Sequence, residues 1–207
     1  MKKPIIGITF REAFCDNRAT YKINKSIINK VLENGGIPIL IFNYDEILIN
    51  TCDGFIIPGG NTWNKLDEKI ILYALKCNKP LLGICAGMQA LGNIMYFDSE
   101  KSDRTIKVNS ISNFNHNILN DCYVHKIKIN DGILLDIIGK KEIEVNSRHN
   151  DTVINNNTFK IEAISDDNII EAISLNPLVI GVQWHPEDLQ DENSNKLFKY
   201  LIEKSKM

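Results

Sequence analysis

The stretch PLLGICAGMQ, residues 80–89, decides how the rest of the chain is organised. Its apolar run LLGI is too short for a helix of its own and is typical of a buried strand. A Gly-x-Cys-x-Gly core follows, and residues 88–95 then show a helical pattern. The stretch therefore predicts a strand that turns sharply into a helix through Cys85.

Cys85 is the candidate nucleophile of this turn. A reactive residue between a strand and a helix forms a nucleophile elbow, and Gly83 and Gly87 remove side chains where such a turn is tightest. The helix that follows directs its unpaired amides and positive dipole end at the sulfur, which favours the thiolate. The other interpretation is a buried structural cysteine, because free cysteine is among the most buried residue types. A catalytic interpretation also needs a base.

The composition is that of an ordinary soluble globular protein. The chain has 207 residues, of which 43% are hydrophobic and 24% charged, and its formal charge is −2. This length predicts one domain over residues 1–207. No basic stripe, signal-peptide core or long apolar run is visible. We therefore expect no nucleic-acid partner, no membrane partner and a cytoplasmic location.

The cysteines and histidines show no spacing typical of a disulfide framework or a metal site. Five cysteines are scattered without a C-x-x-C pair, and four histidines are dispersed. We therefore expect no metal and no cofactor. The cysteines outside glycine-framed turns are expected to be packing residues: Cys15, Cys52, Cys77 and Cys122.

The first half of the chain alternates predicted strands and helices. Strands are expected at residues 3–10, 37–42, 53–57 and at the elbow, and helices at residues 21–34 and 66–77. Gly35 and Gly36 end the first helix, and Asn61, Thr62 or Asn64 caps the second. This alternation is typical of a parallel sheet with helices on both faces.

The second half has a different texture. Strands are predicted at residues 124–129, 142–147, 159–165, 169–175 and 179–184, with an antiparallel hairpin about residues 165–168 and a final helix at 193–204. Residues 98–120, rich in Ser and Asn, are interpreted as a loop. The fold prediction is an α/β protein with a mostly parallel central sheet, helices on both faces and a small antiparallel β extension.

His185 and Glu187, in the segment GVQWHPE, supply a candidate base and its orienting carboxylate. Pro186 restricts His185 to extended conformations, and residues two apart on an extended segment share a face. Glu187 is therefore expected to accept a hydrogen bond from one ring nitrogen of His185, which leaves the other for Cys85. The alternative is a surface histidine and an exposed glutamate beside a proline.

Residues 58–60, Pro-Gly-Gly, follow a strand that is expected to lie beside the elbow strand. A loop without side chains can turn a backbone N–H toward a developing oxyanion. Gly60 and Ala86, the residue after the nucleophile, are the expected donors of an oxyanion hole. On its own, Pro-Gly-Gly is only a turn signal.

Taken together, these motifs resemble the class I glutamine amidotransferase superfamily over nearly the whole chain: P-G-G at 58–60, G-I-C-A-G-M-Q at 83–89 and W-H-P-E at 184–187. The resemblance implies a flavodoxin-like class I glutaminase fold. It also implies a thioester formed at Cys85 from a γ-glutamyl amide, with His185 as general base and acid and Glu187 orienting it.

The segment EVNSRHND, residues 144–151, looks like the V-N-S-x-H segment of the γ-glutamyl hydrolase branch, peptidase family C26, which includes γ-glutamyl-γ-aminobutyrate hydrolases. That similarity implies that the segment holds the α-carboxylate and amine of the glutamyl group. A strand-end turn is the structural alternative for Asn146 and Ser147. The substrate-binding residues expected from the resemblance are Gly59, Asn61, Gln89, Asn146, Ser147, Arg148 and His149.

Two departures from this branch bear on the substrate. The chain has His-Asn-Asp at 149–151 where the branch often shows H-H-Q or H-x-Q, and the loop at residues 61–67 is short. That loop is expected to contact the leaving group. The amine therefore stays open between γ-aminobutyrate, another amine, a nucleotide amidate, and ammonia from glutamine.

Three functions remain open for a chain with these motifs. The first is a stand-alone hydrolase that releases glutamate and an amine from a small γ-glutamyl substrate. The second is a glutaminase subunit that delivers ammonia to a separate synthase partner. The third is a non-catalytic binding module, against which the complete Cys-His-Glu pattern argues. A homodimer is compatible with each of them.

Overall fold

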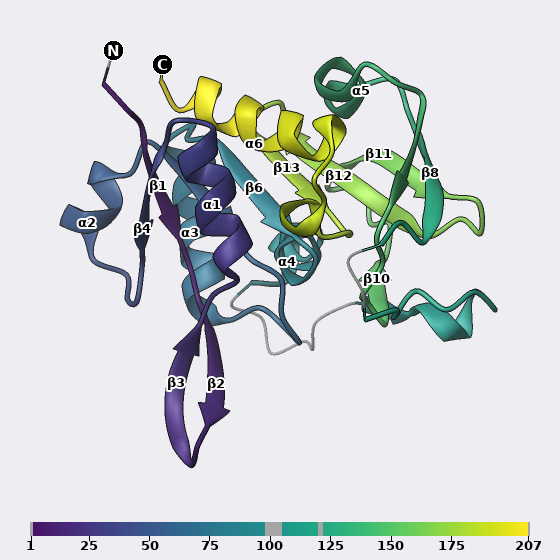
Figure 1. The fold of residues 1–207 in the computed structure, drawn as a ribbon, viewed down its shortest axis with the longest axis horizontal. Helices are drawn as coiled ribbons and strands as arrows, with labels where there is room; N and C mark the ends of the chain where they lie inside the picture. The colour runs from purple at the N-terminus through teal and green to yellow at the C-terminus, as the bar shows by residue number, and fades with distance from the viewer. Residues whose placement is uncertain (1, 98–104, 120–121, 207) are drawn as a thin grey trace.

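The structure is a computed structural model that describes residues 2–97, 105–119 and 122–206 (Figure 1). Its centre is a nine-stranded sheet in the order β4-β1-β5-β6-β13-β12-β11-β8-β9. In that order the strands are Ile37–Leu40, Ile5–Ile8, Gly54–Ile57, Leu81–Ile84, Val179–Val182, Ile170–Asn176, Lys160–Ser165, His125–Ile129 and Glu142–Val145.

The sheet is parallel in one half and antiparallel in the other. Neighbouring strands from β4 to β13 run parallel, and those from β13 to β9 run antiparallel. The predicted α/β fold is confirmed, and its antiparallel extension continues the same sheet. Strand β13 is the boundary, so the elbow strand β6 has parallel neighbours on both sides, β5 and β13.

Helices cover both faces of the sheet, as predicted. One apolar cluster contains Ile27, Leu134 and Phe198 from α1, α5 and α6. The other contains Ile49, Ile70 and Met88 from α2, α3 and α4. Figure 1 shows α1 and α6 in front of the sheet and α3 and α4 behind it. The helices are α1 (Lys25–Glu33), α2 (Glu46–Thr51), α3 (Lys65–Lys76), α4 (Ala86–Gly92), α5 (Ile133–Ile138) and α6 (Glu192–Lys204).

Several local signals had their predicted effect. Helix α1 ends at Glu33, just before Gly35, whose φ of +86° suits glycine. The capping residue of α3 is Asn64, whose side chain accepts hydrogen bonds from the amides of Leu66 and Asp67. Strands β11 and β12 form the predicted antiparallel hairpin. Among the described residues, no helix has the length and apolar character that a membrane span requires.

The N-terminal hairpin was not predicted. Strands β2 (Arg11–Cys15) and β3 (Arg18–Lys22) pair with each other and project from the sheet (Figure 1). The helix predicted from residue 21 therefore begins only at Lys25. Most hairpin side chains are exposed, so no apolar alternation marks the strands. Its Asp-Asn turn, with φ of +50° and +60°, is a weaker signal than Asn-Gly.

The segment predicted as a loop has some regular structure. Residues 98–104 and 120 lie outside the described residues. Within 105–119, strand β7 (Thr105–Lys107) pairs with β10 (Asp151–Val153), and residues 108–110 form a 3-10 turn. Helix α5 was also not predicted, because its six residues are fewer than the two turns that periodicity needs to become visible.

Candidate active site

Cys85 forms the turn between β6 and α4, and its backbone is strained. Its φ of +50° and ψ of −106° are unusual for a residue with a side chain. Gly87 explains how the helix can follow so closely, because a Cβ there would clash with the carbonyl group of Ile57 in β5. The strand–turn–helix predicted for residues 80–89 is confirmed.

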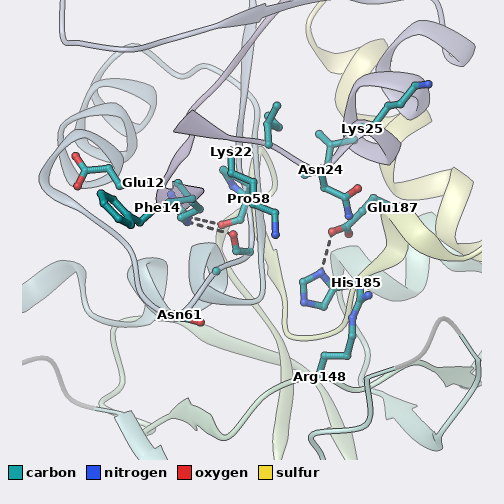
Figure 2. A pocket seen from close by; sticks show the side chains of 16 residues that line it. Glu12, Phe14, Lys22, Asn24, Lys25, Pro58, Asn61, Arg148, His185 and Glu187 are labelled. Carbon is teal, nitrogen blue, oxygen red and sulfur yellow. Dashed lines mark hydrogen bonds and ion pairs between the residues drawn. The ribbon is translucent and has the colours of Figure 1, made fainter. Parts of the chain in front are cut away.

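His185 and Glu187 lie beside this turn. Strand β13 pairs in register with β6, so that Val182 is opposite Ile84 and the chain then continues to His185. The Nδ1 atom of His185 lies 2.8 Å from Oε1 of Glu187, which is buried (Figure 2). One part of the prediction is wrong: Pro186 opens a 3-10 turn, Pro186–Asp188, and this turn, not an extended segment, brings Glu187 to the ring.

The imidazole of His185 also contacts Cys85. A Cβ added to Gly59 would lie 2.5 Å from Cε1 of His185 and 3.3 Å from Cβ of Cys85, so Gly59 packs against both. Burial would lower the pKa of His185, but the charge of Glu187 and the charge and hydrogen bond of Cys85 raise it to about 10. These contacts favour the protonated imidazole, which lies between a carboxylate and the sulfur.

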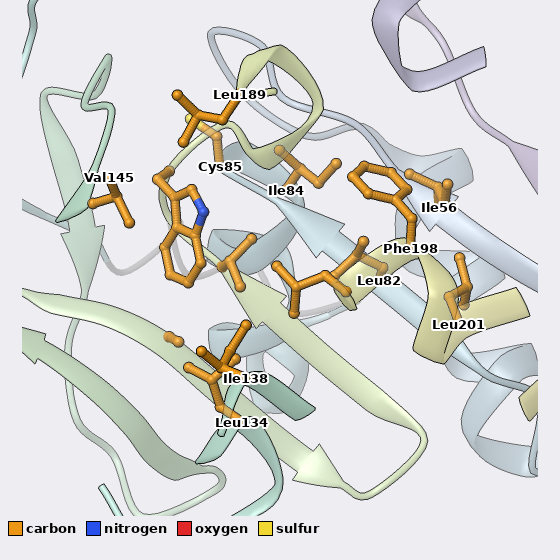
Figure 3. Close-up of a cluster of buried hydrophobic side chains, with 14 of the residues drawn as sticks. Ile56, Leu82, Ile84, Cys85, Leu134, Ile138, Val145, Leu189, Phe198 and Leu201 are labelled. Atoms are coloured by element: carbon orange, nitrogen blue, oxygen red, sulfur yellow. The ribbon is translucent and has the colours of Figure 1, made fainter. Parts of the chain in front are cut away.

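The Cys85 side chain is almost completely buried. Cys85 keeps 4% of its surface exposed, at the edge of the apolar cluster that packs on β6 and β13. Figure 3 shows Cys85 near Leu189, with Ile84 leading into the cluster. Apolar packing therefore fixes the strand ends that carry Cys85 and His185.

Gln183 is a site residue that sequence reasoning missed. Its Nε2 lies 3.6 Å from Sγ of Cys85, and its Oε1 accepts a hydrogen bond from Gln89 at 3.4 Å. Gln89 also donates to the backbone carbonyl of Asp151 at 2.9 Å. The side-chain amide of Gln89 therefore orients that of Gln183, whose N–H group points at the sulfur. Continued past the end of β13 at Val182, period-two alternation would put residues 183 and 185 on one face, and this is the signal that could have identified Gln183.

A cavity of about 740 Å³ opens beside His185. Its walls are the β2–β3 hairpin, the start of α1 and the loop from Pro58 to Asn61. Figure 2 shows the His185 ring in this cavity with Arg148 beside it. Among the described residues, none of 105–119 lines the cavity. The charged side chains that line it are Arg11, Glu12, Lys22, Lys25, Arg148 and Glu187.

The segment around Asn146 divides between the cavity and the interior. Arg148 lines the cavity and forms an ion pair with Asp188. Asn146 is buried and binds the backbone of His185. Ser147 and His149 are buried too, and their polar atoms face other histidine and glutamate side chains.

Of the predicted binding residues, the structure therefore places Gly59, Asn61 and Arg148 in the cavity wall. Gln89, Asn146, Ser147 and His149 lie behind it. Substrate binding by each of these residues stays a prediction.

Arg11 is the second site residue that the sequence did not reveal. Its Nε donates to the carbonyl oxygen of Gly59 at 3.1 Å, and a terminal nitrogen donates to that of Pro58. Another terminal nitrogen pairs with Asp67 at 2.8 Å. Arg11 therefore ties the carbonyl groups of the Pro-Gly-Gly loop to the N-terminus of α3. It lies 47 residues from Pro58, and an isolated arginine carries no local signal.

The partner of Arg11 is deeply buried. Asp67 has no exposed surface, and burial raises its pKa, an effect that Arg11 and Thr9 partly offset. Burial lowers the pKa of Arg11, and the charge of Asp67 opposes that change. Asp67 also accepts the amide of Asn64 at 2.9 Å, which completes the capping box of α3.

Two groups of described side chains place three candidate metal-ligand atoms within 4.8 Å of one another. One is His185, Glu187 and Asp188, in which Nδ1 of His185 is already engaged with Glu187. The second group is separate from the cavity and consists of His116, His149 and Glu171.

Known proteins are similar to this chain in sequence. The family model described as Peptidase C26 matches residues 4–187. A Schizosaccharomyces pombe protein named as a glutamine amidotransferase, PB2B2.05, is 30% identical, over 100% of this chain and 88% of its own length. The γ-glutamyl-γ-aminobutyrate hydrolase PuuD of Escherichia coli K12 is 24% identical, over 90% of this chain and 87% of its own.

A solved structure confirms the fold class. The glutaminase domain of Trypanosoma brucei CTPS, with bound acivicin, superposes with a TM-score of 0.64 at 15% identity. The match covers 96% of this chain and 91% of that one. At this identity the likeness concerns the arrangement of helices and strands.

Proposed function

The chain belongs to the peptidase C26 family, and on that premise we propose that it is a cysteine-dependent hydrolase of the γ-glutamyl amide bond in a small γ-glutamyl compound. Its products would be glutamate and an amine. The observation that carries the proposal is the position of the His185 imidazole, between the Glu187 carboxylate and the Cys85 sulfur.

The proposed reaction has two steps. The Cys85 thiolate attacks the γ-carbonyl carbon, and the tetrahedral intermediate collapses to a thioester as the protonated His185 gives its proton to the departing amine. Water then attacks the thioester while His185 takes a proton from it, and glutamate leaves as the sulfur is restored. The raised pKa of His185 keeps the proton available for the first step.

The negative oxygen of each tetrahedral intermediate needs donors. We assign this role to the backbone amides of Ala86, which follows the nucleophile, and of Gly60. Arg11 supports the assignment because it holds the carbonyl groups of Pro58 and Gly59, which fixes the peptide planes that lead to Gly60.

The size and charge of the cavity favour a substrate larger than glutamine. A glutamyl group bears an α-carboxylate, and Arg148 lines the cavity beside His185 (Figure 2). Lys22 and Lys25 lie in the wall formed by the hairpin and α1. The 740 Å³ volume leaves room for an amine beyond the glutamyl group, and these two lysines favour one that carries a negative charge.

The test is glutamate release from a panel: glutamine, γ-glutamyl-γ-aminobutyrate, and γ-glutamyl amides of neutral and cationic amines. We expect release from at least one member, fastest with an anionic amine. We also expect loss of release in Cys85→Ala, with hydroxylamine trapping a γ-glutamyl hydroxamate from the native protein. Cys77→Ala, which changes an exposed cysteine, is the matched control. Equal release by the native protein and Cys85→Ala would refute the proposal.

The alternative is a glutaminase subunit that delivers ammonia to a synthase. The name of the S. pombe relative favours it. In that case free glutamine would be the preferred member of the panel, and the rate would rise when a co-purifying synthase is added. Preference for a substituted amide, unchanged by any partner, would exclude this alternative.

A further inference from the structure

Three of the four histidines meet around one buried carboxylate, away from the cavity. His116 Nδ1, His125 Nε2 and His149 Nε2 each lie 3.5 Å from Oε1 of Glu171. Glu171 has no exposed surface, and His116 and His149 are 2% and 4% exposed. The dispersed sequence positions gave no sign of this cluster, because its members come from four separate segments of the chain.

Each imidazole is oriented by a hydrogen bond on its far side. His116 donates from Nε2 to Asp167 at 2.9 Å. His125 and His149 donate from Nδ1 to the backbone carbonyl oxygens of Lys126 and Asp151, at 3.2 and 3.1 Å. Metal-binding histidines are typically held in this way, with one N–H on a carboxylate or carbonyl and the other nitrogen toward the ion.

Four of the five atoms on the near side lack hydrogen bonds among the described residues, and the fifth, Nδ1 of His116, contacts Ser147. Nε2 of His125, Nε2 of His149 and both carboxylate oxygens of Glu171 are buried without a hydrogen-bond partner among the described residues. A carboxylate and an imidazole in direct contact would be about 2.7–2.9 Å apart. Ligands bonded at about 2.0–2.1 Å to one tetrahedral ion lie about 3.4 Å apart. The three distances of 3.5 Å match the second arrangement.

We propose that His116, His149 and Glu171 bind a divalent transition-metal ion, and His125, whose Nε2 also lies 3.5 Å from Oε1 of Glu171, is the candidate fourth ligand. Imidazole and carboxylate donors suit Zn²⁺ and its first-row neighbours better than Ca²⁺ or Mg²⁺. Ser147 Oγ lies 3.1 Å from Nδ1 of His116, so this hydroxyl must turn away when the ion binds. A cavity of about 300 Å³ that touches His116 and His149 gives the ion a route in.

The ion would act on structure and not as a reactant. It would join β12, through Glu171, to the segment of residues 146–149 and to residues 105–119. Asn146, which binds the backbone of His185, belongs to the first of these segments. The site would therefore brace one wall of the active site without touching the substrate.

The experiment measures metal content in the full-length chain. Protein freed of metal by a chelator is equilibrated with Zn²⁺, desalted and analysed by mass spectrometry for zinc. It is done in the Cys85→Ala variant, so that the sulfur of the catalytic cysteine cannot bind the ion. We expect one Zn²⁺ for each chain and a Tm that rises with Zn²⁺ concentration.

Paired substitutions locate the ion. Glu171→Gln, in the same background, is expected to lose the bound zinc and the rise in Tm. Glu162→Gln is the matched control, because Glu162 is an equally buried carboxylate on the neighbouring strand β11, bonded to Ser174 at 2.7 Å. The Glu162→Gln variant should keep both the bound zinc and the rise in Tm. Zinc retained by Glu171→Gln, or absent from the parent, would overturn the proposal.

Cobalt gives a test that needs no substitution in the cluster. Co²⁺ bound to the native protein at this site should show d–d absorption without a thiolate charge-transfer band, since the ligands are nitrogen and oxygen only. A thiolate band would show that the ion binds at another site. No visible absorption at saturating Co²⁺ would show that the protein does not bind it. Either outcome would overturn the metal site and leave the proposed hydrolysis untouched.

Discussion

Asn146 binds His185 at both of its polar backbone groups. Its Oδ1 accepts the N–H at 2.8 Å, and its Nδ2 donates to the carbonyl oxygen at 2.9 Å. The residue that carries the imidazole has left β13, so a buried side chain replaces the strand partner that it lacks. This contact makes Asn146 a positioning residue for the base.

We expect Asn146→Ala to lower kcat by about 100-fold, because a shift of about 1 Å in a catalytic group costs that much. It should also lower the free energy of unfolding by about 1–3 kcal/mol, since both backbone groups lose their partner. Glutamate release and denaturant unfolding check the two effects. Asn150→Ala, at an exposed asparagine nearby, should change neither. A rise in KM with unchanged kcat would instead indicate direct substrate binding by Asn146.

The amide of Gln183 is expected to support the reactive sulfur. Gln183→Met keeps the volume and removes the donor 3.6 Å from Sγ of Cys85. We expect kcat to fall by about tenfold, less than the roughly 10²–10³ of an oxyanion donor, because this contact is long. Alkylation of Cys85 by iodoacetamide at about pH 7 should slow in parallel.

The alkylation rate separates this role from a merely structural one. A packing defect would lower the Tm and leave the reactivity of the folded protein unchanged or higher. Gln190→Met, at an exposed glutamine of the same region, is the control. Unchanged alkylation together with reduced kcat would move the function of Gln183 from the sulfur to the substrate.

Lysine should not be able to replace Arg11 in supporting activity. A lysine can keep the charge beside Asp67, but one ammonium group cannot reach the carbonyl groups of both Pro58 and Gly59. We expect Arg11→Lys to fold and to lose about 10- to 100-fold in kcat through a misplaced Gly60 amide. Arg18→Lys, in the exposed part of the same hairpin, should keep full activity.

A second substitution tests the structural side of the Arg11 contact. Arg11→Ala leaves Asp67 buried without its cation, and a broken buried pair costs about 3–5 kcal/mol. Circular dichroism during urea unfolding would measure this loss. Full activity in Arg11→Lys would show that the Pro-Gly-Gly loop holds its conformation without the guanidinium.

The elbow and the parallel half of the sheet could be predicted because their signals are local. Glycines frame Cys85, and each buried strand of this half is a short apolar run. The pairing of His185 with Glu187 also followed from adjacency in the sequence, although the turn at Pro186 was predicted as extended. Residues that act through neighbours in sequence leave a pattern that can be detected.

The missed residues act across the fold. Arg11 reaches a loop 47 residues away, and Glu171 gathers histidines from three other segments. No periodicity connects such positions, since only the strand order of the sheet brings them together. Gln183 lies between these cases, because alternation continued past the end of β13 at Val182 indicates its face but not its contact with the sulfur.

The pH dependence of stability tests the charge of the imidazole. Because Glu187 helps to raise the pKa of His185 to about 10, from an ordinary value near 6.5, the folded protein binds this proton more tightly than the unfolded chain. The stabilisation is complete below about pH 6.5 and is lost as the pH rises toward 10. Stability should therefore decrease across this window.

We expect the difference in unfolding free energy between the parent and Glu187→Gln to be largest near about pH 6 and to shrink steadily above about pH 7. Both proteins carry Cys85→Ala, so that the catalytic thiol does not titrate. The sulfur also helps to raise the pKa of His185, so without it the loss of stability should be centred below about pH 10. Urea unfolding at a series of pH values measures the difference. Glu192→Gln, whose side chain is 80% exposed, should give a difference that does not vary with pH. If the difference for Glu187→Gln is equally independent of pH, the imidazole of His185 is neutral in the folded protein. A neutral His185 could accept a proton from Cys85 but would have no proton to give to the leaving amine.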